Sequence, residues 1–320
     1  MELFRDVNID WLGKKWYFLG FSLIFSVAGI LSLLFWHHIP LGVDFKGGTQ
    51  VRVRFDQTPN EDHIRQAIDR SGIHDARIQR ISDPSGQSAN KVIIALPEST
   101  ATDAAHDAGR QSVENALSKN YHDSGFAVEQ VDIVGPTAGK QLQKQAWLAT
   151  AYSLIGMLVY LWFRFELIYG VAAVVAVFHD TLITVGAFSL TNQEVTLTVI
   201  AAILTLIGYS MNDTIVVFDR IRENLALSRR ESLADVVNRS INQTLSRTVL
   251  TSGLTFLTVL SLYIFGGEVL HGFSFALVVG ILIGTYSSIA VAAPMLVAYQ
   301  DWRGKKGRAV ALPAAKRTRV

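Results

Sequence analysis

Apolar residues gather in six long runs, and each run is long enough to cross a bilayer as a helix. The first run follows Lys14 and Lys15 and is too long for the apolar core of a signal peptide. No small-residue cleavage site follows it, so we expect an uncleaved membrane helix. The predicted spans are approximately Trp16–Trp36, Gln145–Phe163, Leu167–Leu190, Val195–Phe218, Thr248–Phe265 and Gly272–Tyr299.

The polar block between the first two spans has the periodicity of a soluble domain. Apolar and polar residues alternate from Gln50 to Phe55, which is typical of a half-buried strand. Thr58-Pro59-Asn60-Glu61 has the form of a capping box with proline at the first helical position, so a helix should follow. Further strands, a turn and a second helix are predicted at Ala76–Ile81, Asp83–Gly86, Lys91–Leu96, Thr102–Asn120 and Phe126–Val134. The order β-α-β-β-α-β predicts a small ferredoxin-like α+β domain, a fold that hosts many unrelated functions.

Charge divides the chain in the same way as hydropathy. Residues 41–139 hold 14 acidic and 10 basic residues, whereas the remainder holds 13 acidic and 19 basic residues. The bases cluster beside alternate span ends, and the connectors at 191–194 and 266–271 contain none. Because Lys and Arg favour the cytoplasmic side, we expect both termini in the cytoplasm and the α+β domain outside. A composition of 50% hydrophobic and 18% charged residues is typical of a membrane protein.

These patterns predict four parts of the chain. They are the cytoplasmic N-terminus with the first helix at 1–40, the extracytoplasmic α+β domain at 41–139, a five-helix transmembrane bundle at 140–300, and a basic cytoplasmic tail at 301–320. Within the bundle region, residues near 232–245 place apolar side chains such as Leu233 opposite Asn238 and Asn242. This spacing predicts an amphipathic helix lying on the cytoplasmic membrane surface.

Three charged residues inside the spans are candidates for proton transfer. Asp213 lies near the cytoplasmic end of the fourth span, Asp180 follows His179 half-way along the third, and Arg247 begins the fifth. A carboxylate in an otherwise apolar span costs free energy and is by default a functional hypothesis. A buried carboxyl near an arginine can alternately bind and release a proton. The alternative is structural: Asp213 would bond a neighbouring helix, and His179 would satisfy Asp180.

Other polar and small residues have plainer interpretations. Asp219, next to Arg220, is interpreted as a solvated charge at a helix end. Gly47-Gly48 is no phosphate loop, because no Lys-Ser/Thr follows it. The absence of cysteine, of metal-ligand histidine spacing and of a nucleophile elbow leads us to expect no disulfide, metal, cofactor or hydrolase site. Glycines in the spans predict close helix approach, with a conformational role as the alternative: Gly208, Gly253, Gly280 and Gly284.

Four motifs together resemble the SecF family of the bacterial Sec protein-export machinery, a branch of the resistance-nodulation-division superfamily. They are spread over almost the whole chain. The second half of the fourth span is the most specific, since the D-F-x-G-G-T motif also occurs in the sister subunit SecD. The motifs are Asp44-Phe45-Lys46-Gly47-Gly48-Thr49, His179-Asp180, Gly208 to Arg220 with Asn212, Asp213 and Asp219, and Arg247-Thr248 with Thr251-Ser252-Gly253.

The resemblance implies an accessory subunit, not an enzyme, that uses the proton motive force to promote protein export across the bacterial inner membrane. Asp213 and Arg247 match the family's proton-pathway positions, with protons as the coupling ion and no cofactor. The implied partners are SecD, the SecY-SecE-SecG channel, exported unfolded polypeptides and membrane lipids, with YajC and the YidC insertase as further candidates and no nucleic acid. The topology would be half of a superfamily transporter. Two alternatives stay open: half of a proton-coupled small-molecule exporter, and a non-transporting scaffold of the translocon.

Overall fold

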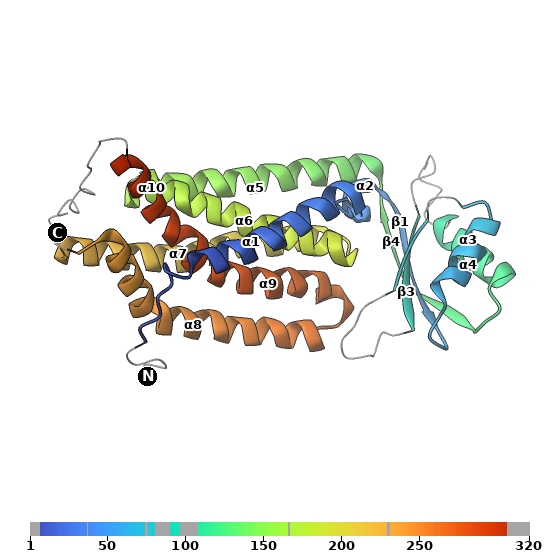
Figure 1. The fold of residues 1–320 in the computed structure, drawn as a ribbon. Coiled ribbons are helices and arrows are strands. Elements are labelled where there is room, and N and C mark those ends of the chain that lie inside the picture. Colours follow the sequence, from blue (N-terminus) through green and yellow to red (C-terminus); the bar gives the residue numbers. More distant parts are fainter. Residues whose placement is uncertain are drawn as a thin grey trace.

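The structure is a computed structural model that describes residues 7–36, 38–73, 76–80, 90–96, 108–165, 167–228 and 231–305. Over these ranges the chain forms a helix bundle with a small α+β domain at one end (Figure 1). The predicted turn at 83–86, the start of the predicted helix at 102–107 and the tail after 305 lie outside the described residues.

Within the described residues, six helices are long and apolar enough to cross a membrane, as the six apolar runs predict. The first and last spans each contain a short π-helical turn. A helix suits a bilayer because it satisfies its backbone hydrogen bonds within one segment. The bounds are α1 Lys15–Leu31, η1 Ser32–Trp36, α5 Pro136–Arg164, α6 Leu167–Thr191, α7 Leu197–Leu227, α8 Leu233–Phe265, α9 Gly267–Ser287, η3 Ser288–Ala292 and α10 Ala293–Lys305.

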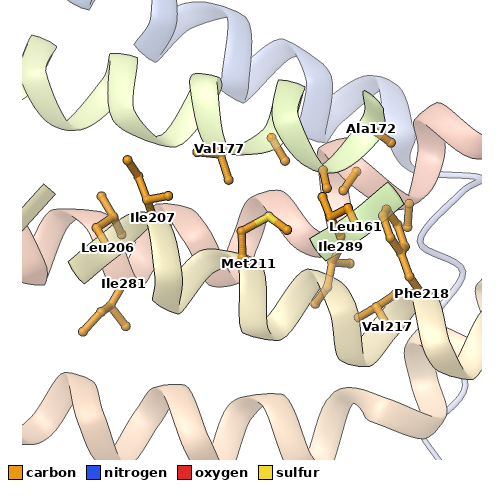
Figure 2. Close-up of a cluster of buried hydrophobic side chains, with 14 of the residues drawn as sticks. Leu161, Ala172, Val177, Leu206, Ile207, Met211, Val217, Phe218, Ile281 and Ile289 are labelled. Atoms are coloured by element: carbon orange, nitrogen blue, oxygen red, sulfur yellow. The ribbon is translucent and has the colours of Figure 1, made fainter. Parts of the chain in front are cut away.

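Helix α7 lies in the core of the bundle, where it packs against α6, α8 and α9. Figure 2 shows its apolar side chains among those of α6 and α9. Because other helices cover the inner faces of α7, polar residues on those faces lie within protein and not in lipid. The buried side chains that Figure 2 labels include Val177, Leu206, Ile207, Met211, Val217, Phe218 and Ile281.

Glycines lie at two close helix crossings. A Cβ on Gly186 of α6 would lie 2.6 Å from the Cα of Gly29 on α1, which is closer than a side chain allows. On α9, a Cβ on Gly280 would lie 2.5 Å from Leu206 of α7, and one on Gly284 would lie 3.0 Å from Ser210. The predicted close approach at Gly280 and Gly284 is therefore confirmed.

For Gly208 and Gly253 close helix approach stays a prediction, because no described residue of this chain comes close to either glycine. A Cβ on either residue would meet nothing within 4 Å among the described residues. Both glycines lie within unbroken helices, on faces that this chain leaves open. Sequence alone cannot separate a glycine that contacts a helix from one that faces away, because both reduce side-chain volume equally.

Helix α5 lies at the edge of the bundle (Figure 1). It begins at Pro136, well before the predicted start at Gln145, and proline suits the first helical position. Much of its apolar surface is exposed, as expected for a helix whose surroundings are lipid. The exposed side chains include Trp147, Tyr152, Ile155, Trp162 and Phe163.

The α+β domain has a four-stranded antiparallel sheet in the order β2-β3-β1-β4. Val51 in the central strand pairs with Ile94 on one side and Val131 on the other. Helices α3 and α4 cover the sheet face directed away from the bundle (Figure 1). This confirms the predicted β-α-β-β-α-β fold. The bounds are α2 Val43–Lys46, β1 Gly48–Phe55, α3 Glu61–Arg70, β2 Arg77–Arg80, β3 Lys91–Leu96, α4 Ala108–Asn120 and β4 Phe126–Val134.

The first helix of the domain begins later than the sequence predicts. Asn60 is its N-cap, and the Asn60 side chain accepts a 2.9 Å hydrogen bond from the backbone N–H of Asp62. Thr58 and Pro59 therefore precede the helix. Asparagine is at least as good an N-cap as threonine, and here Asn60 is the N-cap in place of Thr58.

The predicted surface helix near 232–245 is instead the first part of α8, which runs without a break from Leu233 to Phe265. Its apolar residues Leu233, Val237 and Ile241 are buried in the bundle core. The expectation that this face lies on the membrane surface is therefore wrong. An apolar stripe has the same sequence pattern whether protein or lipid covers it.

Candidate functional site

Asp213 lies near the middle of α7 and is 2% exposed. The hydroxyl of Ser252 on α8 donates a 2.6 Å hydrogen bond to Asp213 Oδ2. Helix α7 continues to Leu227, beyond the predicted end at Phe218, so Asp213 lies farther from the helix end than the sequence predicts. The site is thus a buried carboxyl whose bonded partner is a neutral hydroxyl. Such a group can take up a proton without first breaking an ion pair.

Arg247 lies on α8, on the side of Ser252 toward the N-terminus of that helix. Its charge acts on Asp213, but the two side chains form no direct ion pair in the described part of the chain. The residue is exposed, whereas Asp213 is buried. The structure therefore brings the predicted pair into one region, with an electrostatic interaction in place of a direct bond.

Asp180 is a second buried carboxyl, on α6, and is 1% exposed. Its Oδ1 lies 2.9 Å from His179 Nδ1. Its Oδ2 accepts hydrogen bonds from Ser210 of α7 at 2.6 Å and from Ser287 of α9 at 2.8 Å. His179 Nε2 in turn lies 3.1 Å from the hydroxyl of Ser22 on α1. The His179–Asp180 pair on α6 thus bonds side chains of α1, α7 and α9. No third metal-ligand residue joins the pair: the described residues contain no group of three His, Cys, Asp or Glu side chains that could hold a metal ion.

Further buried hydroxyl side chains lie next to Asp180 and on the same face of α7 as Asp213. On α7, Ser210 lies one turn before Asp213, and Thr214 directly follows Asp213. The Thr214 hydroxyl lies 2.9 Å from the Ser288 hydroxyl. Ser287 and Ser288 are consecutive, yet one bonds α6 and the other α7. They lie where α9 becomes the π turn η3, and π turns often occur at functional sites. The result is a buried polar layer between α6, α7 and α9.

These serines were not predicted as site residues. A single serine in a membrane helix carries little signal, because its hydroxyl can bond the backbone of its own helix. One signal was available: Ser210, Asp213 and Thr214 have the three- and four-residue spacing of one helical face. Ser252 appeared only as part of a family motif.

The remaining residues of the fourth-span motif do not share the Asp213 site. Asn212 is exposed, whereas Asp213 is buried. Asp219 is half-exposed and pairs with Arg164 at 2.7 Å and with Arg222 at 3.3 Å. Arg220 pairs with Glu223 at 2.9 Å. The predicted helix-end charge at Asp219 is therefore part of a small ionic cluster, at the end of the bundle opposite the α+β domain.

Asp44, Gly47 and Gly48 lie where the α+β domain meets the bundle. Asp44 Oδ2 accepts a 2.8 Å hydrogen bond from the backbone N–H of Leu197, the first residue of α7. Gly47 and Gly48 have φ values of 76° and 121°, which glycine adopts without strain. A Cβ on Gly47 would also lie 3.1 Å from the Cα of Pro136. The glycines therefore let the chain turn from α2 into β1 while touching the start of α5.

Comparison with known proteins identifies the family. The SecD/SecF protein export membrane protein C-terminal model matches residues 113–302, and the SecD/SecF GG motif model matches residues 37–59. The protein translocase subunit SecF of Koribacter versatilis is 56% identical, over 98% of this chain and 96% of its own length. The chain belongs to the SecF family. Its GG motif comprises the Asp44–Gly48 junction described above.

Further relatives also support membership of the SecF family. The SecF subunit of Calditerrivibrio nitroreducens is 43% identical, over 95% of this chain and 98% of its own length. The crystal structure of SecDF, a translocon-associated membrane protein from Thermus thermophilus, matches with a TM-score of 0.81 and 35% identity. It covers 92% of this chain and 39% of the SecDF chain, which fits SecD as a partner. The SecF-family chain is therefore a multi-pass inner-membrane subunit with an accessory role in Sec translocation and a transport role, not a catalytic one.

Proposed function

We propose that this SecF-family chain uses the proton motive force to promote protein export, with Asp213 as the proton-binding group. The observation that carries the proposal is the setting of Asp213: a buried carboxyl, bonded to the neutral hydroxyl of Ser252, within the field of Arg247 but not paired with it. A neutral Asp213 no longer attracts Arg247. Proton uptake would therefore change the force between α7 and α8 and let the two helices repack.

The energy available from a proton is modest but sufficient for such a change. One charge that crosses the membrane is worth about 2.3 kcal/mol per 100 mV. That amount shifts a two-state equilibrium by about fiftyfold, which biases a domain motion but does not unfold a folded protein. The proposed work is therefore to move the α+β domain and so favour forward movement of an exported, already unfolded polypeptide.

The direction of transfer follows from the proposed orientation. The basic connectors favour cytoplasmic termini and a periplasmic α+β domain, and the domain lies at the opposite end of the bundle from α10 (Figure 1). Protons would enter from the domain side and leave to the cytoplasm. The domain would then act where exported chains emerge. The proposed partners are SecD and the SecY-SecE-SecG channel, with YajC and YidC as further candidates.

We assign Asp180 a secondary place in the same route. Asp180 accepts from Ser210, which lies one turn before Asp213 on α7, and from Ser287, whose neighbour Ser288 bonds Thr214 next to Asp213. Side-chain hydroxyls both donate and accept, so they can pass a proton or exchange partners when Asp213 changes its charge. The contribution of Asp180 is expected to be smaller than that of Asp213, because its three partners hold it in one arrangement.

The test is export into vesicles with and without an imposed proton gradient. Asp213→Asn keeps an oxygen that accepts from Ser252 but cannot bind and release a proton. We expect it to abolish the gradient-dependent part of export, whereas Glu223→Gln, an exposed position on the same helix, should retain it. Asp180→Asn and Arg247→Met are compared in the same assay. Wild-type stimulation in Asp213→Asn would refute the proposal.

The scaffold alternative makes a different prediction for the same variant. If Asp213 only holds helices together, Asp213→Asn should reduce insertion or co-purification with SecD. If it binds protons, assembly should stay at the wild-type level while gradient-dependent export is lost. The names of the relatives favour a translocase subunit over half of a small-molecule exporter.

A further inference from the structure

The loop between α6 and α7, residues 192–196, is held by the α+β domain. Arg77 on β2 donates hydrogen bonds from Nη2 to the Asn192 carbonyl oxygen at 3.2 Å and to Asn192 Oδ1 at 2.8 Å. Its Nε lies 3.6 Å from Glu194 Oε1, and the Glu194 side chain is 9% exposed. One guanidinium thus bonds two residues of the loop, although Arg77 and Asn192 are 115 positions apart in sequence. This contact docks the sheet on the bundle.

Asp44 holds the other end of the same loop. Its carboxylate accepts from the backbone N–H of Leu197, the first residue of α7. The expected N-cap, Thr196, makes no capping bond from its side chain, and its hydroxyl lies 2.9 Å from that of Thr198 instead. The first N–H groups of a helix have no partner within the helix, and the helix dipole favours a negative charge there. Asp44 therefore caps α7 from another element.

Backbone bonds fix the segment before Asp44 to this loop as well. Val195 N–H donates to the Pro40 carbonyl at 2.7 Å, and Gly42 N–H donates to the Val195 carbonyl at 3.0 Å. On the far side, a Cβ on Gly139 of α5 would lie 3.1 Å from Phe45 O of α2. The short helix α2 is therefore packed between the start of α5 and the start of α7, directly before β1.

We propose that Asp44 and Arg77 form a clamp on residues 192–197 that makes the α+β domain move with α7, the helix that carries Asp213. Leu197 and Asp213 are 16 residues apart on one unbroken helix, or about 24 Å at helical rise. A shift of α7 at Asp213 is then carried along the helix to the domain. Asp44 and Arg77 are positioning residues, since neither touches the proton site. The transmitted motion rests on the proposed function, whereas the docking does not.

The docking is tested by a distance measurement on the full chain in lipid vesicles. The protein has no cysteine, so Ser118→Cys on the exposed face of α4 and Ser261→Cys on the exposed face of α8 provide the only two labelling sites. Spin labels at these sites report the distance from domain to bundle without any gradient. We expect one narrow distance distribution in the otherwise unaltered chain.

Matched variants then address each half of the clamp. Arg77→Gln should broaden the distribution or add a longer distance, whereas Arg80→Gln should not, because Arg80 lies on the same strand but pairs with Glu61 inside the domain. Asp44→Ala should broaden it, and Asp44→Asn, which keeps an acceptor for the Leu197 N–H, should largely restore it. Wild-type distributions in both Arg77→Gln and Asp44→Ala would overturn the clamp. If Asp44→Ala inserts poorly, the Arg77 and Arg80 comparison decides alone.

The coupling is tested by export in the same variants. We expect Arg77→Gln and Asp44→Ala to lose at least half of the gradient-dependent part of export and to keep the gradient-independent part. If the domain undocks but stimulation stays at the wild-type level, the coupling is wrong. If the unaltered protein shows no stimulation at all, the proposed function fails, and the distance measurements still judge the docking independently.

Discussion

Ser252 on α8 donates a 2.6 Å hydrogen bond to Asp213 on α7, and both side chains are buried. Removal of the hydroxyl in Ser252→Ala would leave a buried carboxyl without its side-chain donor, which costs about 1–3 kcal/mol. We therefore expect a lower thermal unfolding temperature in detergent and weaker gradient-dependent export. Ser252→Thr keeps the hydroxyl and should retain both properties.

Ser261→Ala provides the control for that prediction, because Ser261 lies on the same helix but is exposed. If Ser252→Ala and Ser261→Ala unfold at the same temperature, the hydrogen bond contributes nothing measurable to the fold. If only export falls, the Ser252 hydroxyl acts on the charge state of Asp213 and not on helix packing.

The spans and the sheet could be predicted because hydropathy and periodicity are local properties. The run that became α7 is mostly apolar from Val195 to Phe218, and the alternation at Gln50–Phe55 survives as strand β1 inside the sheet. Asp213 could be predicted for the same reason, since one acid in an apolar run is a local anomaly. What each residue contacts could not be predicted in this way.

The contacts of the site depend on residues far apart in the sequence. Asp180 and Ser287 are 107 positions apart, and Asp44 and Leu197 are 153 apart. No periodicity connects such positions, so the hydroxyl layer and the cap of α7 emerge only from the folded bundle. Arg247 shows the same limit. The sequence predicts which span it begins and which side of the membrane it lies near, but not that it interacts with Asp213 without a direct bond.

The crossing of α1 and α6 predicts a strong response to one added methyl group. A Cβ on Gly186 would lie 2.6 Å from the Gly29 backbone, which cannot move away as a side-chain tip can. Overpacking of this kind costs about 1–3 kcal/mol. We expect Gly186→Ala to lower the thermal unfolding temperature in detergent. Gly156→Ala on α5 meets nothing within 4 Å and should be neutral or slightly stabilising, because alanine favours helix. Equal effects of the two substitutions would contradict this crossing.

Glu194 predicts a specific pH dependence at the domain junction. Burial raises the pKa of Glu194 above its ordinary 4.5, an effect that Arg77 and Lys46 oppose and Asp44 reinforces. The folded state therefore binds a proton more tightly than the unfolded state does. The raised pKa of Glu194 therefore adds to the free energy of unfolding. This contribution is complete below pH 4.5 and is lost as the pH rises through the higher, folded-state pKa. The difference in unfolding temperature between the unaltered chain and Glu194→Gln should change over that window.

Arg77 gives this prediction a second test. Because Arg77 lowers the pKa of Glu194, Arg77→Gln should extend the window to higher pH. Glu114→Gln is the control, since Glu114 pairs with Arg110 within α4, away from the junction. A difference between the unaltered chain and Glu194→Gln that stays constant across pH would show that the carboxyl has the same pKa in both states.

Asn242 on α8 holds the segment before the first span. Its side-chain oxygen accepts from the Ile9 N–H at 3.2 Å and from Trp11 Nε1 at 3.1 Å, and its side-chain nitrogen donates to the Ile9 carbonyl at 2.9 Å. At about 0.5–1.5 kcal/mol for each bond, Asn242→Ala should raise the open population of this segment by about tenfold or more. Trypsin cleavage at Lys14 and Lys15 should accelerate accordingly in a limited-proteolysis time course.

Asn238 provides the graded control for Asn242, one helical turn away. Its side chain makes a single bond to this segment, from the Trp11 N–H at 2.8 Å. Asn238→Ala should therefore accelerate cleavage less than Asn242→Ala does. Equal rates in the two variants would show that Trp11 packing, and not the amide bonds, holds the segment. Both asparagines lie on the polar face that the sequence assigned to water, and the structure gives that face to the protein's own N-terminal segment.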